Sequence, residues 1–284
     1  MIKKEAIDAL RLYEGDIRIR NKKGKLVYGQ SKNILYRDEN AYRTLNALLF
    51  PEIHSEYSRI HLEKHQLNIE FVKNIEGTIE IFYHIFSLMC KMRNNEENST
   101  ILVRRVDRKS ALQEYKKGIM CSFVSTSKKS YDTEFAEKDG IVLLEIQLNN
   151  HIPYLDLEKV LGDEYKNYWE REVLLSPFLS IDIEKIELEY EERKIKDMNG
   201  KIPVGKYRIV PKELVDFSKS NILKDSKEEI REKIIQGKDI AIQAIETMNK
   251  GEWDDDFISY KEWKKNFQNY LHQMLSDMWY RREE

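Results

Sequence analysis

The sequence lacks the features of a membrane-spanning or disulfide-bonded secreted chain. No apolar run approaches the ~18 residues that cross a bilayer, and no continuous apolar stretch of a secretory signal follows the first methionine. The two cysteines, Cys90 and Cys121, lie in apolar segments, which favours buried free thiols over a disulfide framework. These absences predict a protein of a reducing compartment without a membrane partner.

The sequence also lacks an excess of charge of either sign. Lysine and arginine number 48 against 50 aspartate and glutamate, a net charge of −2, which argues against a generally basic nucleic-acid binder. No glycine-rich phosphate loop is present, so ATP-binding and Rossmann interpretations have no support. No cluster of metal ligands stands out, and we expect no metal.

The sequence contains enough apolar residues to build a core. Of its 284 residues, 41% are hydrophobic and 35% are charged, which fits one large domain or two small ones. Residues 1–98 are mostly helical in pattern, residues 99–211 are rich in strand patterns without strict strand–helix alternation, and residues 212–284 are again helical. We therefore predict an α+β protein whose first domain spans residues 1–211, followed by a helical C-terminal extension.

Two glutamates stand one residue apart in "NYWEREVLLSPF", at the entrance of an apolar run. If this segment is a strand, Glu170 and Glu172 point to the same face, roughly 6–7 Å apart, with Arg171 on the other face. Two carboxylates at that separation raise each other's pKa or need a cationic partner. Such a pair suits chemistry that develops positive charge beside a nucleophile. Taken alone, the pair is more typical of a solvated strand start.

Two polar strand segments precede the glutamates. "ILVRRVD" carries Arg104 and Arg105, and an arginine leaving an apolar strand needs an anion or water. A diphosphate is a natural partner for a planar guanidinium group. "SFVSTSKK" ends an apolar strand in Ser125, Thr126 and Ser127, whose hydroxyls suit a carboxylate or a ribose. Taken alone, each segment is more typical of an edge strand or of a strand end bonded to its own backbone.

Together these segments resemble the R-S-E class of mono-ADP-ribosyltransferases, which includes the actin-modifying clostridial binary toxins and the vertebrate arginine ADP-ribosyltransferases. "ILVRR" is similar to the family's arginine strand, "FVSTS" to its F-x-S-T-S segment and "EREVLLSP" to its E-x-E-[IV]-L-L-x-P segment. "YRTLNALL" resembles the Tyr-x-x-Ile-Asn helix motif ahead of the arginine strand. Two positions depart from the family: Val103 replaces a frequent aromatic residue, and Phe50 replaces a frequent arginine.

The resemblance implies a fold and a reaction. The fold would be a split β-sandwich of two short sheets, with a catalytic domain over residues 1–211 that is helical over 1–98 and β-rich over 99–211. Residues 212–284 would form the helical extension. NAD would be the substrate, and its bond between nicotinamide and ribose would break through a transition state that resembles an oxocarbenium ion.

The resemblance also assigns roles to four residues. Glu172 would be the catalytic glutamate, which stabilises the developing positive charge and hydrogen-bonds a ribose hydroxyl. Ser125 would hold Glu172 in place, and Arg104 would bind the diphosphate. Glu170 would position or deprotonate the acceptor, and a glutamate at that place goes with arginine acceptors in the family.

Further contacts follow from the same resemblance. The predicted NAD contacts are Arg104, Arg105, Ser125, Thr126, Ser127, Tyr131, Phe135 and Glu172. The predicted acceptor contacts are Tyr168, Trp169 and Glu170. For Tyr131, Phe135 and Trp169, packing within their own domain is the alternative.

The resemblance therefore predicts an NAD-dependent protein-arginine ADP-ribosyltransferase, a glycosyltransferase that acts as a toxin, bacterial effector or defence enzyme. Its partners would be an acceptor protein with an accessible arginine and, for a toxic enzyme, a neutralising partner. It would lie in the cytoplasm of the producing bacterium or reach a target cell by a route that the sequence does not show. Two alternatives stay open: transfer to nucleic acid, which the net charge does not favour, and a catalytically silent NAD-fold binding module.

Overall fold

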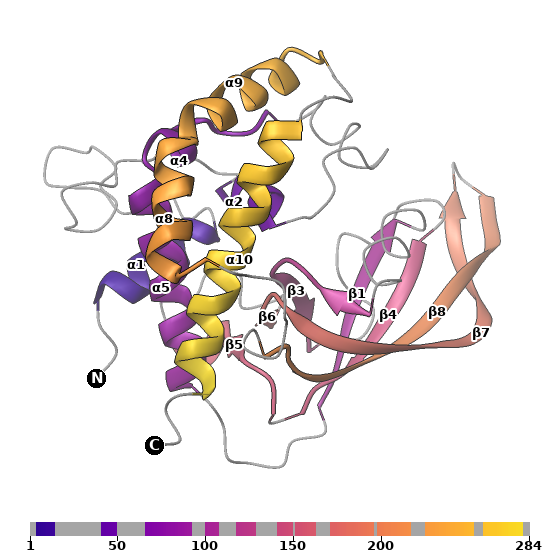
Figure 1. The fold of residues 1–284 in the computed structure, drawn as a ribbon. Helices are drawn as coiled ribbons and strands as arrows, with labels where there is room; N and C mark the ends of the chain where they lie inside the picture. The colour runs from indigo at the N-terminus through magenta and orange to yellow at the C-terminus, as the bar shows by residue number, and fades with distance from the viewer. Residues whose placement is uncertain are drawn as a thin grey trace, which may run out of the picture. The chain divides into compact units, whose positions relative to one another are not determined.

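The computed structural model divides the chain into two compact units (Figure 1). One unit contains residues 1–91 and 216–284, and the other contains residues 92–215. The structure describes residues 4–14, 41–49, 66–92, 100–107, 118–128, 141–149, 151–162, 171–195, 198–216, 225–252 and 258–280. Within these ranges, the side chains of residues 105–107, 141–143, 185–195 and 198–205 are not described.

All the regular secondary structure described in the first unit is helical. Its helices are α1 (Lys4–Tyr13), α2 (Ala41–Leu49), α4 (Glu70–Lys73), α5 (Ile75–Lys91), α8 (Lys227–Gln236), α9 (Lys238–Asn249) and α10 (Ile258–Tyr280). The long helix α10 packs against α2, α5, α8 and α9 (Figure 1). Leu67 and Asn249 exchange two hydrogen bonds of 2.8 Å, which join the start of α4 to the end of α9.

An aromatic stripe on α10 forms part of this unit's core. Tyr260, Trp263, Phe267 and Tyr270 are buried, and the Trp263 ring stacks on those of Tyr260 and Phe267 with centroids 6.0 and 5.6 Å apart. The Trp263 indole donates a 2.8 Å hydrogen bond to the backbone oxygen of Ile234 on α8. This burial follows from the helical spacing of large apolar side chains.

A capping box starts α8. The backbone N–H of Glu229 donates to the Ser226 hydroxyl at 3.2 Å, and the Ser226 N–H donates to the Glu229 carboxylate at 2.6 Å. The exchange satisfies two helix-start donors that would otherwise lack partners. It also lowers the pKa of Glu229, because the Ser226 backbone N–H and hydroxyl stabilise the carboxylate.

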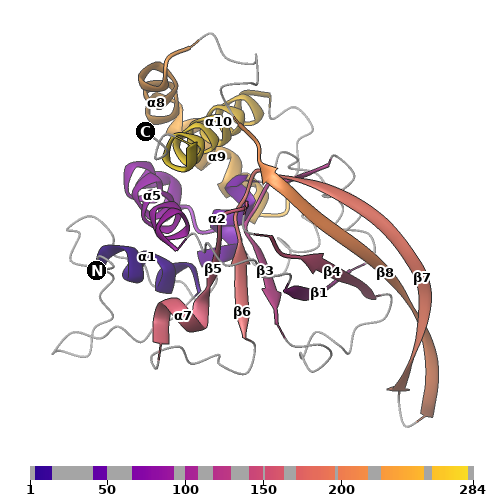
Figure 2. The same cartoon turned by 90° about the horizontal axis from the view of Figure 1, so that it is seen from below.

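The second unit contains every described strand and one short helix. Its elements are β1 (Ile101–Asp107), β2 (Ile119–Met120), β3 (Val124–Ser127), β4 (Ile141–Gln147), β5 (Tyr154–Asp156), α7 (Leu157–Leu161), β6 (Glu172–Leu175), β7 (Leu179–Ile195) and β8 (Met198–Leu214). β7 and β8 form a long two-stranded ribbon (Figure 2). Only β4 and β8 pair in parallel; the other described pairs are antiparallel.

The predicted α+β class and the helical C-terminal part are confirmed. The described strands, however, hydrogen-bond in one sheet of eight in the order β2-β7-β8-β4-β1-β3-β6-β5, where two short sheets were predicted. The sheet turns a corner between two groups of strands. There β2 leads along the chain into β3, and β6, which pairs with β3, leads into β7, which pairs with β2. Phe178 turns this corner at φ 63°, and its N–H donates to the backbone oxygen of Met120.

The compact units do not follow the predicted order of domain and extension. The C-terminal helices join the N-terminal helices in one unit, and the strands form the other. That residues 1–211 act as a catalytic domain and 212–284 as an extension stays a prediction. None of the described helices is both long and apolar enough to cross a bilayer.

Candidate active site

The three motif segments lie on three adjacent strands of the sheet. β1 carries the two arginines, β3 carries the Ser-Thr-Ser triplet, and β6 begins with Glu172. In the sheet, β3 lies between β1 and β6 and pairs antiparallel with both. Segments far apart in the sequence are therefore brought onto neighbouring strands by hydrogen-bonded backbone.

Ser127 and Glu172 are direct cross-strand partners in the pair β3·β6. Both residues are buried, and both have an interaction partner. Ser125 lies two positions along β3, opposite Leu174, so it shares the face of Ser127 and Glu172. Ser125 is half-buried. A carboxylate with two serines on one face is suited to orienting a sugar hydroxyl and stabilising a nearby positive charge.

On the opposite face of the same strands, a side-chain hydrogen bond joins β3 to β6. The buried Thr126 hydroxyl donates a 2.7 Å hydrogen bond to the backbone oxygen of Val173, its cross-strand partner. This bond ties β3 to β6 beneath the face that carries Glu172.

The register of β1 places Arg104 on this opposite face. Val103 pairs with Ser127, so Val103 shares the face of Glu172 and Arg104, one residue later, faces the other way. The Arg104 Nη1 donates a 2.6 Å hydrogen bond to the backbone oxygen of Ser125. Its Nε is buried without a hydrogen-bond partner among the described groups. By strand alternation, the next β1 position on the face of Glu172 after Val103 is position 105. The side chain of Arg105 lies outside the described set.

The strand that carries Glu172 starts later than the sequence predicted. β6 begins at Glu172, and Arg171 before it has φ 43°, in the left-handed region. The strand alternation that placed Glu170 and Glu172 on one face therefore does not apply, because Arg171 is not extended. Glu170 itself lies outside the described residues.

Four further predicted residues also lie outside the described residues. They are Tyr131 and Phe135, predicted beside the nicotinamide, and Tyr168 and Trp169, predicted beside the acceptor. Their roles stay predictions.

The structure adds two residues that the sequence did not single out. Lys128 follows the Ser-Thr-Ser triplet, and its backbone N–H donates to the Arg171 oxygen at 3.2 Å. Its ammonium group forms an ion pair with the buried carboxylate of Asp156 on β5. Lys128 was visible as part of "STSKK", but no local pattern connects it with an aspartate 28 residues away.

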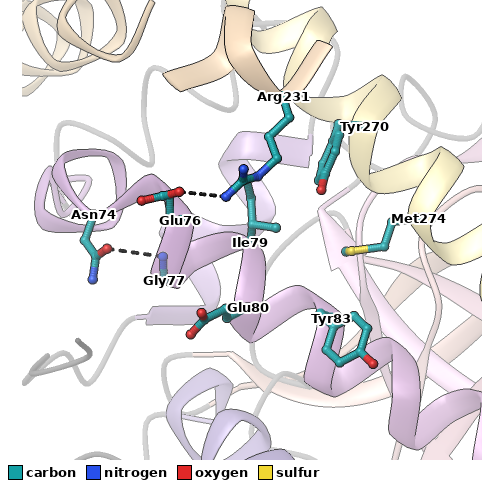
Figure 3. Close-up of a pocket in the computed structure, with 9 residues that line it drawn as sticks. All are labelled: Asn74, Glu76, Gly77, Ile79, Glu80, Tyr83, Arg231, Tyr270 and Met274. Atoms are coloured by element: carbon teal, nitrogen blue, oxygen red, sulfur yellow. Dashed lines mark hydrogen bonds and ion pairs between the residues drawn. The ribbon is translucent and has the colours of Figure 1, made fainter. Parts of the chain in front are cut away.

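A separate pocket of about 340 Å³ lies within the helical unit (Figure 3). Side chains from α5, α8 and α10 line it, and the Glu76 carboxylate accepts a 2.6 Å hydrogen bond from Arg231 across its wall. Of the residues predicted for NAD or acceptor binding, none of those that the structure describes lines this pocket. Among the described side chains, no three histidines, cysteines or acidic groups gather as metal ligands would.

Comparison with known proteins finds a limited structural likeness. The enzymatic component C2-I of the C2 toxin from Clostridium botulinum, as a mutant at pH 3.0, matches at 16% identity and a TM-score of 0.36, over 61% of this chain and 44% of that chain. The non-mutant C2-I structure at pH 3.0 gives 16% identity and a TM-score of 0.33, over 61% and 43%. This chain thus matches less than half the length of those structures. No protein-family model and no curated protein matches the chain.

Proposed function

We propose that this protein transfers ADP-ribose from NAD to an arginine of a target protein. The observation that carries the proposal is the cross-strand pair of Ser127 with Glu172, with Ser125 on the same face and the arginine strand β1 directly beside β3. Three motifs that resemble the R-S-E class in sequence occupy neighbouring strands, which supports the proposal that they serve one substrate. Burial of Glu172 suits a carboxylate that acts on a cationic transition state, because electrostatic interactions strengthen away from water.

The proposed reaction replaces one bond at the nicotinamide ribose. The bond between nicotinamide N1 and ribose C1′ breaks, and its electron pair passes to the nicotinamide ring, which becomes neutral. A guanidine nitrogen of the acceptor forms the new bond to C1′ and loses one proton. Glu172 would stabilise the positive charge on the ribose, and Ser125 and Ser127 would orient that carboxylate and the ribose hydroxyls.

Arginine is the proposed acceptor because of Glu170. A carboxylate can bind a guanidinium group through two parallel hydrogen bonds and can take up the proton that the attack releases. Tyr168 and Trp169, directly before Glu170, are the proposed contacts of the target surface. The support for this part is the sequence resemblance alone, since all three residues lie outside the described part of the chain.

The biological role proposed is that of a toxin, effector or defence enzyme. Modification of an arginine removes its ability to form paired hydrogen bonds and adds two phosphates, so it disrupts the surface that carried the residue. A producing cell that holds such an enzyme in active form needs a neutralising partner.

The test compares wild type with Glu172→Gln in the presence of labelled NAD, with and without a cell lysate. Glutamine keeps the size of the side chain and removes the negative charge. Glu145→Gln is the matched control, because Glu145 is also largely buried on this sheet face, in a 2.7 Å ion pair with Lys206. It lies three strands from Glu172, roughly 14 Å at the usual strand spacing.

We expect wild type and Glu145→Gln to release nicotinamide and to label a protease-sensitive product, while Glu172→Gln does neither. Mass spectrometry of the labelled peptides would identify the modified residue, and a label on any residue other than arginine would contradict the acceptor proposal. A nuclease-sensitive product would replace the protein acceptor with a nucleic acid. A wild-type protein that consumes no NAD with any lysate would leave the silent binding module as the better description.

A further inference from the structure

The residue before β6 has a left-handed backbone conformation, which non-glycine residues rarely adopt. Arg171 has φ 43°, and it stands directly before Glu172. Residues in the left-handed region persist where surrounding contacts fix them. The contacts that fix Arg171 therefore also fix the direction in which the chain enters Glu172.

One of these contacts comes from Lys128. The Lys128 N–H donates to the Arg171 oxygen at 3.2 Å, which extends the β3·β6 pairing one residue beyond Ser127 and Glu172. Lys128 is thus part of the same hydrogen-bonded ladder as the candidate catalytic carboxylate.

The Lys128 side chain makes a second connection, on the other side of β6. Its ammonium group pairs with Asp156 on β5, and β6 lies between β3 and β5 in the sheet. Asp156 is opposite Val173 in the register, so it shares the face of Thr126 and not that of Glu172. The ion pair therefore spans β6 on the face away from the candidate site.

Asp156 is itself fixed. Its carboxylate caps α7 by accepting a 3.4 Å hydrogen bond from the Lys159 N–H, and the residue is buried. A partly buried ion pair contributes little net stability over an apolar pair, because both charges lose water. The two charged groups lie on the strands that flank β6, one on each side of the Arg171–Glu172 junction. This placement favours a role in fixing the backbone conformation at that junction.

We propose that the ion pair of Lys128 with Asp156 is a positioning clamp for Glu172. It holds β3 and β5 against the first residue of β6 and so keeps Arg171 in its left-handed conformation and Glu172 directed at its face. This inference rests on the proposed function. Neither residue touches the substrate: both act through the backbone of Arg171 and Glu172.

The first arm of the test is kinetic. Asp156→Asn keeps the helix cap and removes the charge, and we expect a fall in kcat of about 10–100-fold, with the KM for NAD within about 3-fold of wild type. Lys128→Met is expected to lose activity similarly, and Lys128→Arg, which keeps the charge, to restore it. Rates are divided by the folded fraction measured by circular dichroism at the assay temperature, so that simple destabilisation does not count.

Asp182→Asn is the control for the loss of an ion pair in this sheet. Asp182 pairs with Lys212 at 2.7 Å, and both side chains are more than half exposed. We expect this variant to keep the wild-type kcat. An equal fall in Asp182→Asn and Asp156→Asn would overturn the clamp.

The second arm needs no NAD. Amide hydrogen exchange at Lys128, whose N–H bonds the Arg171 oxygen, is expected to speed up at least 10-fold in Asp156→Asn and in Lys128→Met, but not in Asp182→Asn. If wild type consumes no NAD, the proposed function fails while exchange still decides whether the clamp holds the junction. Unchanged amide exchange together with unchanged kcat would overturn the proposal. If Asp156→Asn does not fold, Lys128→Met is used for both the kinetic and the exchange measurements.

Discussion

Ser127 and Glu172 face each other directly across the antiparallel pair of β3 and β6. Such partners have Cβ atoms about 4.5–5.5 Å apart, within reach of a serine hydroxyl and a carboxylate. The family resemblance gave the task of holding Glu172 to Ser125, which lies opposite Leu174 instead. The register therefore favours different roles for the two serines. Ser127 would contact the Glu172 carboxylate, and Ser125 would contact the ribose.

Single alanine substitutions separate the two serines. Ser127→Ala is expected to lower kcat for nicotinamide release by about 10–100-fold with little change in KM, because the hydroxyl placed opposite the Glu172 carboxylate is removed. Ser125→Ala is expected mainly to raise the KM for NAD. Steady-state kinetics on both variants decides the matter. A fall in kcat confined to Ser125→Ala would return the role to Ser125.

Thr126 between them should behave as a structural residue. Thr126→Val keeps the shape and loses the 2.7 Å hydrogen bond to the Val173 oxygen, which leaves a buried carbonyl without this donor. We expect the free energy of unfolding to fall by about 1–3 kcal/mol, measured by urea denaturation, with kcat preserved. Thr126→Ser, which retains the hydroxyl, is the control. A raised KM for NAD at unchanged stability would instead support the NAD contact that the resemblance implied.

The strands at the site were predictable from sequence, because each motif borders an apolar run. "ILVRR", "FVSTS" and "EVLL" all read as strands with a polar boundary, and all three are strands in the structure. Their pairing in the sheet was not predicted, since local patterns contain no pairing information. The exact start of β6 did not follow, because nothing in "WEREV" marks Arg171 as a left-handed residue.

Long-range contacts explain the other differences. The hydrogen bonds between Leu67 and Asn249 join residues 182 apart and help to place the C-terminal helices with the N-terminal ones. The corner at Phe178 joins two sets of strands into one hydrogen-bonded order, although the sequence there shows only a strand break at Pro177. The clamp of Lys128 and Asp156 depends on β5 lying beside β6, which no periodicity encodes.

The helical unit contains a lysine that should make its stability depend on pH. Lys264 on α10 is 4% exposed, and burial lowers its pKa to about 7. No described residue forms an ion pair or hydrogen bond with its ammonium group. Since the unfolded chain takes up this proton at pH values up to about 10.5, the unfolded state binds more protons between pH 7 and 10.5.

The free energy of unfolding should therefore rise with pH across that window, and the cost of the buried lysine is fully present below about pH 7. Lys264→Met is expected to stabilise the unit at pH 7 by a few kcal/mol, on the order of the shift at about 1.4 kcal/mol per pH unit, and to flatten the pH dependence. Denaturation followed by tryptophan fluorescence at pH 7, 8.5 and 10 measures both effects. Lys261→Met, one turn earlier and exposed, is the control. An equal slope in wild type and Lys264→Met would show that the charge reaches water.

The two adjacent arginines of β1 should differ in what their loss affects. Arg104 donates to the Ser125 oxygen and lies on the face of Thr126, so it connects β1 to β3 from below the candidate site. Alternation assigns the position of Arg105 to the face of Val103, Ser127 and Glu172. We therefore expect Arg105 to bind the diphosphate and Arg104 to support the strand that carries the serines.

Lysine substitutions keep the charge at both positions and remove the planar group that forms paired hydrogen bonds. Arg105→Lys is expected to raise the KM for NAD about 10-fold or more at unchanged stability. Arg104→Lys is expected to lower the free energy of unfolding by about 1–2 kcal/mol with a smaller effect on KM, because lysine lacks the Nη1 group that donates to the Ser125 oxygen. Urea denaturation and NAD titration on the two variants measure both quantities. If Arg104→Lys alone weakens NAD binding, the guanidinium of Arg104, whose Nε is buried without a described partner, is the diphosphate ligand that the sequence resemblance first indicated.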